Sequence, residues 1–325
     1  MIKVTAGIDI GGTGTQFGLV DPDGQVLTEG KVDTRGTHSF EEFIDKIAAF
    51  LRQHLVENPG LELTGIGVGA PSGNYYTGTI TDAPNLPWKG TLDVVQLLND
   101  RFHVPVVLSN DANATAMGEK VFGAAKDIKD FVMITLGTGL GSGIVSSQQL
   151  VIGSQSMAAE FGHVMVRDKG GRLCNCGRRG CLETYVSATG IKRTLTSLLA
   201  KHPCASALRS VSFDDLTSKD IAHAARSGDV LAKKAFQKTG RVLGKNLANL
   251  VAIMNPEAIF LFGGLAQAGD LIFNPTRRAL EENLLDMYKG KVQVLPSALG
   301  SQGAAILGAA SLAHQQKDYL HYELS

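Results

Sequence analysis

A cluster of cysteines carries the most readable chemistry in this sequence. Three of the chain's four cysteines, Cys174, Cys176 and Cys181, fall within the segment "CNCGRRGC" (174–181). Structural zinc takes four ligands, and His163, eleven residues before Cys174, is the candidate for the fourth. Spacing alone leaves a disulfide or free thiols as alternatives. A zinc ion with four protein ligands has no open position, so we expect its role to be structural.

Two glycine-rich loops form a second set of candidate binding residues. The segments "GIDIGGTGTQFGLV" (7–20) and "MITLGTGLGSGIV" (133–145) share one plan, an apolar strand, glycines and a second apolar strand. A Walker A loop would need a Lys after the glycines and a Rossmann loop would need a helix there. The plan instead predicts a β-hairpin that binds phosphate through backbone N–H groups, once per domain, with two unrelated turns as the alternative. The loop residues concerned are Gly11, Gly12 and Thr13, and Gly137, Thr138 and Gly139.

Two aspartates lie beside these patterns. Asp9 directly precedes the first loop, where we expect it to organise Mg²⁺ near the phosphates; capping of the loop is the alternative. Asn110 and Asp111 end the strand "VPVVLSND" (104–111), and ligand sites of α/β proteins gather at such strand ends. Asp111 is therefore a candidate general base, and the alternative is an Asx-turn that closes the strand.

The elements that must position these residues alternate between strands and helices, which predicts an α/β fold. At 325 residues the chain exceeds the size of one usual core, so two domains are expected. The residues 39–57 predict an amphipathic helix, with a capping box formed by Ser39 and Glu42. Further helices are predicted over 220–236, 239–254 and 302–316.

Composition excludes several classes of protein. Lys and Arg together number 31, and Asp and Glu also number 31, so no field favours nucleic acid or an anionic membrane as partner. No apolar run is long enough to span a bilayer. The start "MIKVTAGIDIGG" (1–12) has no signal-peptide pattern, so we expect a cytoplasmic protein in which clustered cysteines bind metal. Cys204 stands apart and is expected to be structural.

Taken together, the motifs resemble the ROK family of sugar kinases and repressors, within the actin-like ATPase superfamily. The resemblance covers essentially the whole chain, and residues 69–90 look like the bacterial glucokinase branch. It rests on "DIGGTGTQ" (9–16), "LSNDANA" (108–114), "LGTGLGSGIV" (136–145), "AAEFGHVMV" (158–166), "CNCGRRGCLE" (174–183) and "LFGGLA" (261–266).

The resemblance implies two RNase-H-like lobes around a central cleft. A small lobe would contain residues 1–118, completed by a C-terminal helix within 302–325, and a large lobe would contain residues 119–301 with the zinc-binding loop. It makes Asp111 the general base and gives Asn110 a hydrogen bond to a sugar hydroxyl. It further assigns sugar contacts to Glu160, His163 and Glu183, places Asn85 and Gly73 beside the sugar, and places Gly263 and Gly264 near adenine.

The implied activity is phosphorylation of a hexose by ATP with Mg²⁺, with glucose as the favoured substrate and structural Zn²⁺. N-acetylmannosamine, N-acetylglucosamine, mannose, fructose and allose are alternative substrates, and polyphosphate is an alternative donor. The loops between residues 70 and 90 and around residue 155 would decide among the sugars. A sugar-responsive repressor is the alternative from another class, disfavoured because only six residues precede Gly7. Family members imply a homo-oligomer, a dimer or a tetramer.

Overall fold

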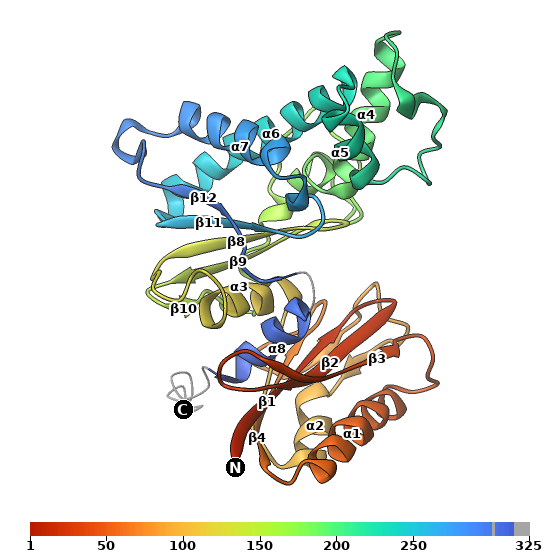
Figure 1. Cartoon of the computed structure of the whole chain (residues 1–325), viewed down its shortest axis with the longest axis vertical. Coiled ribbons are helices and arrows are strands. Elements are labelled where there is room, and N and C mark those ends of the chain that lie inside the picture. The colour runs from red at the N-terminus through yellow and green to blue at the C-terminus, as the bar shows by residue number, and fades with distance from the viewer. Residues whose placement is uncertain (301–302, 315–325) are drawn as a thin grey trace. The chain divides into compact units, whose positions relative to one another are not determined.

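The computed structural model of the chain describes residues 1–300 and 303–314 (Figure 1). The chain divides into two compact units. Unit 1 contains residues 1–128, residues 149–158 and the chain from 297 onwards, and unit 2 contains residues 129–148 and 159–296. The lobe boundaries expected after residues 118 and 301 stay a prediction, and residues 302, 315 and 316 of the predicted closing helix lie outside the described residues.

Unit 1 is built on a five-stranded sheet. Its order is β3-β2-β1-β4-β7, in which β1, β2 and β3 are antiparallel neighbours while β4 and β7 run parallel to β1. The strands are β1 (Ile2–Ile10), β2 (Gly14–Val20), β3 (Val26–Asp33), β4 (Leu61–Gly69) and β7 (Val106–Ser109). Two very short strands, β5 (Ile80–Thr81) and β6 (Thr91–Leu92), pair in the loop that follows β4.

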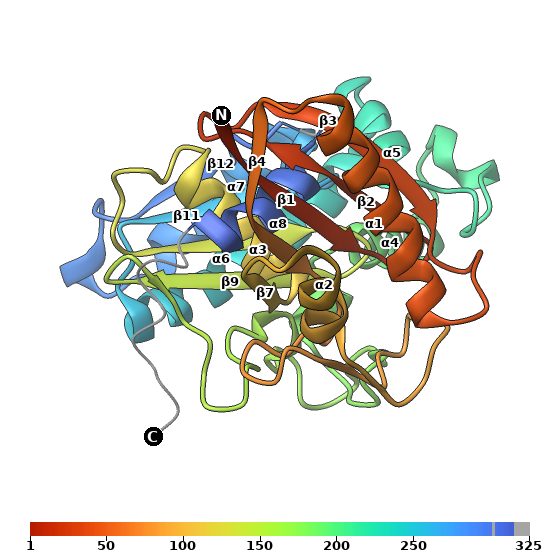
Figure 2. The ribbon, with the colours of Figure 1, turned by 90° about the horizontal axis from the view of Figure 1, so that it is seen from below.

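Helices cover both faces of this sheet. The helices α1 (Phe40–Glu57) and α2 (Val94–Phe102) pack on one face, as Figure 2 shows, and α3 (Asp111–Val121) and α8 (Ala304–His314) pack on the other. Because side chains alternate along a strand, Val4, Ala6, Ile8 and Ile10 of β1 all enter the core under α1 and α2. Gly7, which lies between Ala6 and Ile8, points to the opposite face and meets α8. A Cβ atom there would collide with the Ile306 carbonyl.

The predicted capping box of α1 forms only in part. Ser39 Oγ accepts the N–H of Glu42 at 3.1 Å, as expected for an N-cap. The Glu42 carboxylate, however, accepts the N–H of His38 at 3.0 Å and not that of Ser39. The predicted apolar face is buried from Phe40 to Leu51. The helix therefore begins where the sequence places it, with one of the two reciprocal bonds moved by one residue.

Unit 2 repeats the plan of the first sheet. The strands β8 (Phe131–Leu136) and β9 (Leu140–Ser146) form an antiparallel hairpin, and β11 (Ala258–Phe262) and β12 (Gln293–Pro296) continue parallel to β8. The short strand β10 (Gln149–Leu150) follows β9 along the chain. In both sheets a glycine hairpin is followed by parallel strands, as the internal repeat suggests.

The helices of unit 2 correct one sequence prediction. Its helices are α4 (Ala188–Lys201), α5 (Ser218–Arg226), α6 (Val230–Met254) and α7 (Asp270–Asn283). The predicted helix over 220–236 is wrong, because the chain breaks after α5 and then continues unbroken through 237–239. Gly228 takes a φ of +100°, and Asp229 caps α6 by accepting the N–H groups of Leu231 and Ala232.

Five single 3₁₀ turns complete the described chain. They are η1 (Phe161–His163), η2 (Leu182–Thr184), η3 (Ala207–Ser210), η4 (Ala266–Ala268) and η5 (Asp286–Tyr288), and the first two carry predicted site residues. Within residues 1–300 and 303–314, no helix combines the length and the apolar character that crossing a bilayer requires.

Candidate functional site

In unit 1 the predicted residues gather where parallel strands end. Asp9 lies near the end of β1, Gly69 ends β4, and Asp111 follows β7. A Cβ atom on Gly69 would lie 3.4 Å from Asp9 Oδ1 and 3.7 Å from Asp111 Cα. The glycine therefore lets two acidic residues approach across the sheet edge, where ligands of α/β proteins bind.

Asn110 and Asp111 begin helix α3. Asn110 is the N-cap, and its Oδ1 accepts the N–H of Asn113 at 2.6 Å. Asp111 is the first helical residue, and its Oδ1 accepts the N–H of Ala112 at 2.9 Å. The cap uses the amide oxygen of Asn110, so its NH₂ group is the part that could donate to a ligand. The remaining carboxylate oxygen of Asp111, on an exposed side chain, could accept a proton.

Both carboxylates are harder to ionise than ordinary aspartates. Burial raises the pKa of Asp9 to about 7, and the negative charge of Asp111 adds to the shift. The protein around the Asp111 carboxylate also raises its pKa, although the N–H group of Ala112 opposes that effect. A raised pKa suits a group that must accept a proton near neutral pH.

The first glycine loop keeps its N–H groups open. Its carbonyls are held from outside, since Thr34 Oγ1 donates to the Gly11 carbonyl at 2.7 Å and Arg35 Nε donates to the Gly12 carbonyl at 3.2 Å. Among the residues that the structure describes, none accepts a hydrogen bond from the N–H groups of Gly11, Gly12 or Thr13. This arrangement fits a polyphosphate, because the loop's only unsatisfied groups are donors.

Thr34 and Arg35 were missed at the level of sequence. They follow β3, a strand whose polar alternation "VLTEGKVD" (26–33) gave no apolar signal. Their role depends on the pairing of β3 with β2, which brings residues 34 and 35 beside the loop. The two residues hold the loop in place from outside the phosphate side.

Asn85 and Gly73 also reach this end of unit 1. The Asn85 carbonyl oxygen would lie 2.7 Å from a Cβ on Gly12, so the residue abuts the first loop. A Cβ on Gly73 would lie 2.7 Å from the carbonyl oxygen of Ser109, next to Asn110. The loops that were expected to choose the sugar also meet, since the N–H of Tyr75 donates to Ser156 Oγ at 2.8 Å.

In unit 2 the second glycine loop joins β8 to β9. The N–H of Ala188, at the start of α4, donates to the Gly137 carbonyl at 2.9 Å. Gly263 follows β11 with a φ of +96°, and a Cβ there would lie 2.8 Å from the Leu136 carbonyl oxygen. Gly264 faces open space. Thr138, Gly139 and the glycine pair therefore share one end of the second sheet.

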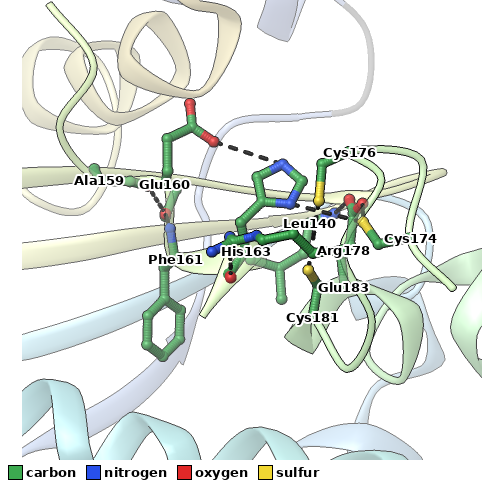
Figure 3. Close-up of polar contacts among 11 residues, drawn as sticks. Leu140, Ala159, Glu160, Phe161, His163, Cys174, Cys176, Arg178, Cys181 and Glu183 are labelled. Carbon is green, nitrogen blue, oxygen red and sulfur yellow. Dashed lines mark hydrogen bonds and ion pairs between the residues drawn. The ribbon is translucent and has the colours of Figure 1, made fainter. Parts of the chain in front are cut away.

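The cysteine cluster forms as the spacing predicts (Figure 3). The ligand atoms of His163, Cys174, Cys176 and Cys181 all lie within 4.8 Å of one another. Cys174 Sγ lies 3.7 Å from His163 Nδ1, and Cys176 Sγ lies 3.6 Å from Cys181 Sγ. Two sulfur atoms each about 2.3 Å from a tetrahedral zinc ion would be roughly 3.8 Å apart, so the set fits zinc.

The alternative of a disulfide does not form in this structure. All four cysteines are free, and 3.6 Å between Cys176 and Cys181 far exceeds a sulfur–sulfur bond of about 2.0 Å. Protonation differs among the thiols. Burial raises the pKa of Cys174 and of Cys181, whereas the backbone N–H of Arg178 lowers the pKa of Cys176 to about 6.

His163 links the cluster to the predicted sugar residues. Its Nδ1 faces Cys174, and its Nε2 lies 3.8 Å from Glu160 Oε2, as Figure 3 shows. Arg178 is exposed, and its Nη2 donates to the His163 carbonyl at 2.7 Å. Glu183 Oε1 accepts from Cys174 Sγ at 2.9 Å, and its Oε2 accepts the N–H of Leu140 at 3.4 Å.

Comparisons with known proteins agree with this picture. A glucokinase from Thermotoga maritima is 35% identical over 308 residues, which is 94% of this chain and 96% of that protein. A ROK family glucokinase from Streptomyces griseus, solved with glucose and AMPPNP, superposes with a TM-score of 0.78 at 36% identity. The match covers 96% of this chain and 99% of that one. The α/β class and the actin-like ATPase fold are thereby confirmed.

Regulators are also among the relatives. A xylose repressor from Bacillus subtilis is 31% identical over 269 residues, which is 83% of this chain and 65% of the repressor. The model of the ROK family matches residues 5–316, nearly the whole sequence. With the glycine hairpins, the Asn-Asp pair and the cysteine cluster all in place, the chain belongs to the ROK family.

Proposed function

We propose that the chain is a hexose kinase that transfers the γ-phosphoryl group of ATP to the 6-hydroxyl of glucose. The observation that carries the proposal is the placement of Asp111. It begins a helix at the ends of β1, β4 and β7, next to Asp9 and in the same unit as a glycine loop with open N–H groups. The relatives named glucokinase, and the structural neighbour that holds glucose and AMPPNP, support the same substrates.

Asp111 is the proposed general base. The 6-hydroxyl is a weak nucleophile, so its oxygen must be positioned and its proton removed as the new bond forms. The O6–P bond forms while the bond from γ-phosphorus to the bridging oxygen breaks, so ADP leaves and the proton passes to Asp111. The raised pKa of this carboxylate favours its taking the proton. Asn110, Glu160, His163 and Glu183 are proposed to orient the sugar hydroxyls.

The glycine loops are the proposed phosphate sites. The N–H groups of Gly11, Gly12 and Thr13 would donate to phosphate oxygens, which needs no positive side chain. Magnesium, when bound, would neutralise phosphate charge, and Asp9 is the proposed residue nearest to it. Burial and, to a lesser extent, the charge of Asp111 raise the pKa of Asp9, so a cation there would favour the ionised pair.

The cysteine cluster is the proposed zinc site. Its four ligands would leave no open position, so zinc would supply rigidity and no reaction step. Zinc at Nδ1 of His163 would fix the tautomer that keeps a proton on Nε2, the nitrogen that faces Glu160. The metal would then set the geometry of a predicted sugar ligand.

A second candidate is a sugar-responsive regulator, because xylose repressors are among the relatives. A coupled assay of ADP release separates the two. The panel is glucose, mannose, fructose, allose, N-acetylglucosamine and N-acetylmannosamine, each with Mg·ATP. We expect turnover highest with glucose. Absence of turnover with every sugar would favour the regulator.

The variant Asp111→Asn tests the base. Asn keeps the size of the side chain and an oxygen for the Ala112 N–H, so only the proton acceptor is lost. We expect kcat to fall roughly 10²- to 10⁴-fold while the KM for glucose changes little. The control Asp127→Asn, an exposed aspartate of the same unit, should keep full activity. A kcat of Asp111→Asn within tenfold of the parent would defeat the assignment.

A further inference from the structure

Unit 2 contains a cavity that none of the assignments above uses. Its volume is about 490 Å³, within the range of small-molecule sites. It lies among α4, α6 and residues 166–185, and none of its lining residues belongs to the glycine loops, the zinc cluster or the proposed sugar contacts. The cavity is therefore lined by residues other than those proposed for the kinase reaction.

The lining of the cavity is strongly cationic. It includes Arg167, Arg172, Lys201, Lys238 and Lys245, together with His202, and none of the described residues that line it is Asp or Glu. The whole chain has a formal net charge of zero, so this concentration of positive charge is local. Clefts lined by charge of one sign concentrate ligands of the opposite sign.

These cations are not neutralised by the protein. The ion pairs found among the described residues involve other side chains, so none of the five arginines and lysines has a carboxylate partner within 4.0 Å. Lys238 and Lys245 are seven residues apart on α6, two turns along one face of the helix. Arg167 and Arg172 lie on the segment between His163 and Cys174.

Arg172 is the fixed member of the set. Its Nη1 donates to the carbonyls of Thr184 at 2.7 Å and Gly190 at 3.0 Å, and its Nη2 donates to Thr194 Oγ1 at 3.0 Å. The guanidinium also stacks 4.6 Å from the ring centre of Tyr185. With five N–H groups in all, it keeps the Nε–H and one Nη2–H for a ligand.

A buried hydroxyl in the same wall also lacks a partner. Thr239 is 1% exposed, and its Oγ1 forms no hydrogen bond with any residue that the structure describes. The hydroxyl oxygen itself is almost inaccessible, so it is not among the groups that a ligand in the cavity would contact. The remaining wall combines apolar side chains, Val166, Leu198 and Val242, with polar ones, among them Ser197 and Asn246.

We propose that this cavity binds a small phosphorylated anion. Five cations without counter-charges favour a ligand with at least two negative charges, and phosphoryl oxygens accept from Arg and Lys together. The apolar side chains of the wall and the volume would also admit a carbon skeleton of sugar size. Inorganic phosphate, pyrophosphate and a hexose 6-phosphate share this chemistry.

Calorimetric titration of the full chain tests the site. Pyrophosphate, inorganic phosphate and glucose 6-phosphate are titrated separately, without magnesium, at an ionic strength of about 0.05 M. The test variant is Lys238→Gln with Lys245→Gln, which removes two cations from the cavity. Its control is Lys233→Gln with Lys291→Gln, which removes the same charge from exposed positions of the same unit.

We expect at least one probe to bind the parent with a Kd of about 1 mM or tighter. The cavity variant should bind it roughly tenfold more weakly or worse, and the control within about twofold. Tighter binding of glucose 6-phosphate than of inorganic phosphate would identify the ligand as a sugar phosphate, and the reverse order a free phosphate. Lack of binding by every probe, or equal weakening in both double variants, would overturn the proposal.

Discussion

Asp9 and Asp111 show how two similar side chains receive different tasks. Both flank Gly69, so the charge of one opposes ionisation of the other. Asp9 comes directly before the open N–H groups of the first loop, whereas Asp111 begins a helix beside Asn110. From these positions we propose that Asp9 serves the phosphates and that Asp111 accepts the sugar proton.

The variant Asp9→Asn should stabilise the ligand-free protein in a pH-dependent way. Between the ordinary pKa of 3.8 and the native value of about 7, the folded state keeps a proton that the unfolded chain has lost. The stability of the parent therefore falls as pH rises through that range, and Asn removes this loss. We expect a gain on the order of 1–3 kcal/mol above pH 7, shrinking towards pH 5, in urea unfolding without magnesium.

The control for this experiment is Asp127→Asn, which removes an exposed carboxylate from the same unit. It should change stability by less than about 0.5 kcal/mol at either pH. If the gain from Asp9→Asn were the same at pH 5 as at pH 8, proton linkage would not be its cause.

At the scale of elements, helix α8 depends on glycine for its contact with the sheet. A Cβ atom on Gly67 of β4 would collide with the carbonyl group of Ala309. We expect Gly67→Ala to reduce the free energy of unfolding by about 1–3 kcal/mol, because neither the strand nor the helix can move freely. Gly60→Ala, at a position open to solvent, should change it by less than about 0.5 kcal/mol. Urea unfolding measures both, and equal losses would disprove this account of the packing.

The zinc loop is the second element whose role can be tested. Cys176→Ala removes one proposed ligand, so zinc content by mass spectrometry should fall. The KM for glucose should then rise roughly tenfold, and that for ATP much less, because His163 joins the cluster to Glu160. Cys204→Ala removes an exposed free thiol and should alter neither value. An unchanged KM for glucose in a zinc-free variant would contradict the proposal that the metal site positions a sugar ligand.

Sequence patterns predicted elements well where chemistry constrains several neighbours at once. The cysteine–histidine cluster followed from the spacing of its residues, and the glycine hairpins followed from apolar runs on both sides. The break before α6 was missed because the apolar period continues across Gly228, although Gly228 followed by the N-cap Asp229 is a helix-boundary signal. The hydrogen bond of the Glu42 carboxylate likewise depends on local geometry. The carboxylate accepts from the N–H of His38, whereas a capping box would use the N–H of Ser39.

Long-range assembly was the least predictable part of the candidate sites. Arg35 reaches the first loop only because β3 pairs with β2. The cationic cavity draws on Arg167, Lys201, Lys238 and Lys245, which come from separate segments and look like ordinary surface residues in the sequence. Such sites follow from the tertiary fold and have no local signature.

At the scale of the whole molecule, the chain leaves unit 1 after residue 128, rejoins it for residues 149–158, and returns to it for good at residue 297. The returning segment supplies α8, whose Ile306 and Ala310 are fully buried against unit 1. Both ends of the excursion are held at neighbouring residues of α3. Lys120 Nζ donates to the Ile128 carbonyl at 2.8 Å, and Glu119 Oε1 accepts the N–H of Ala298 at 2.9 Å. A short linker could therefore replace residues 129–296, which are unit 2 together with the 149–158 segment of unit 1.

This path predicts that residues 1–128 do not fold alone. Without α8, one face of β1 and β4 would expose backbone and apolar side chains that the full chain buries. A variant that joins residues 1–128 to 297–325 through a flexible linker of about ten residues restores that cover. We expect the joined variant to show near-ultraviolet circular dichroism and one cooperative thermal transition, and the shorter fragment to show neither. A cooperative transition in the fragment at the same temperature would mean that unit 1 is complete without the returning helix.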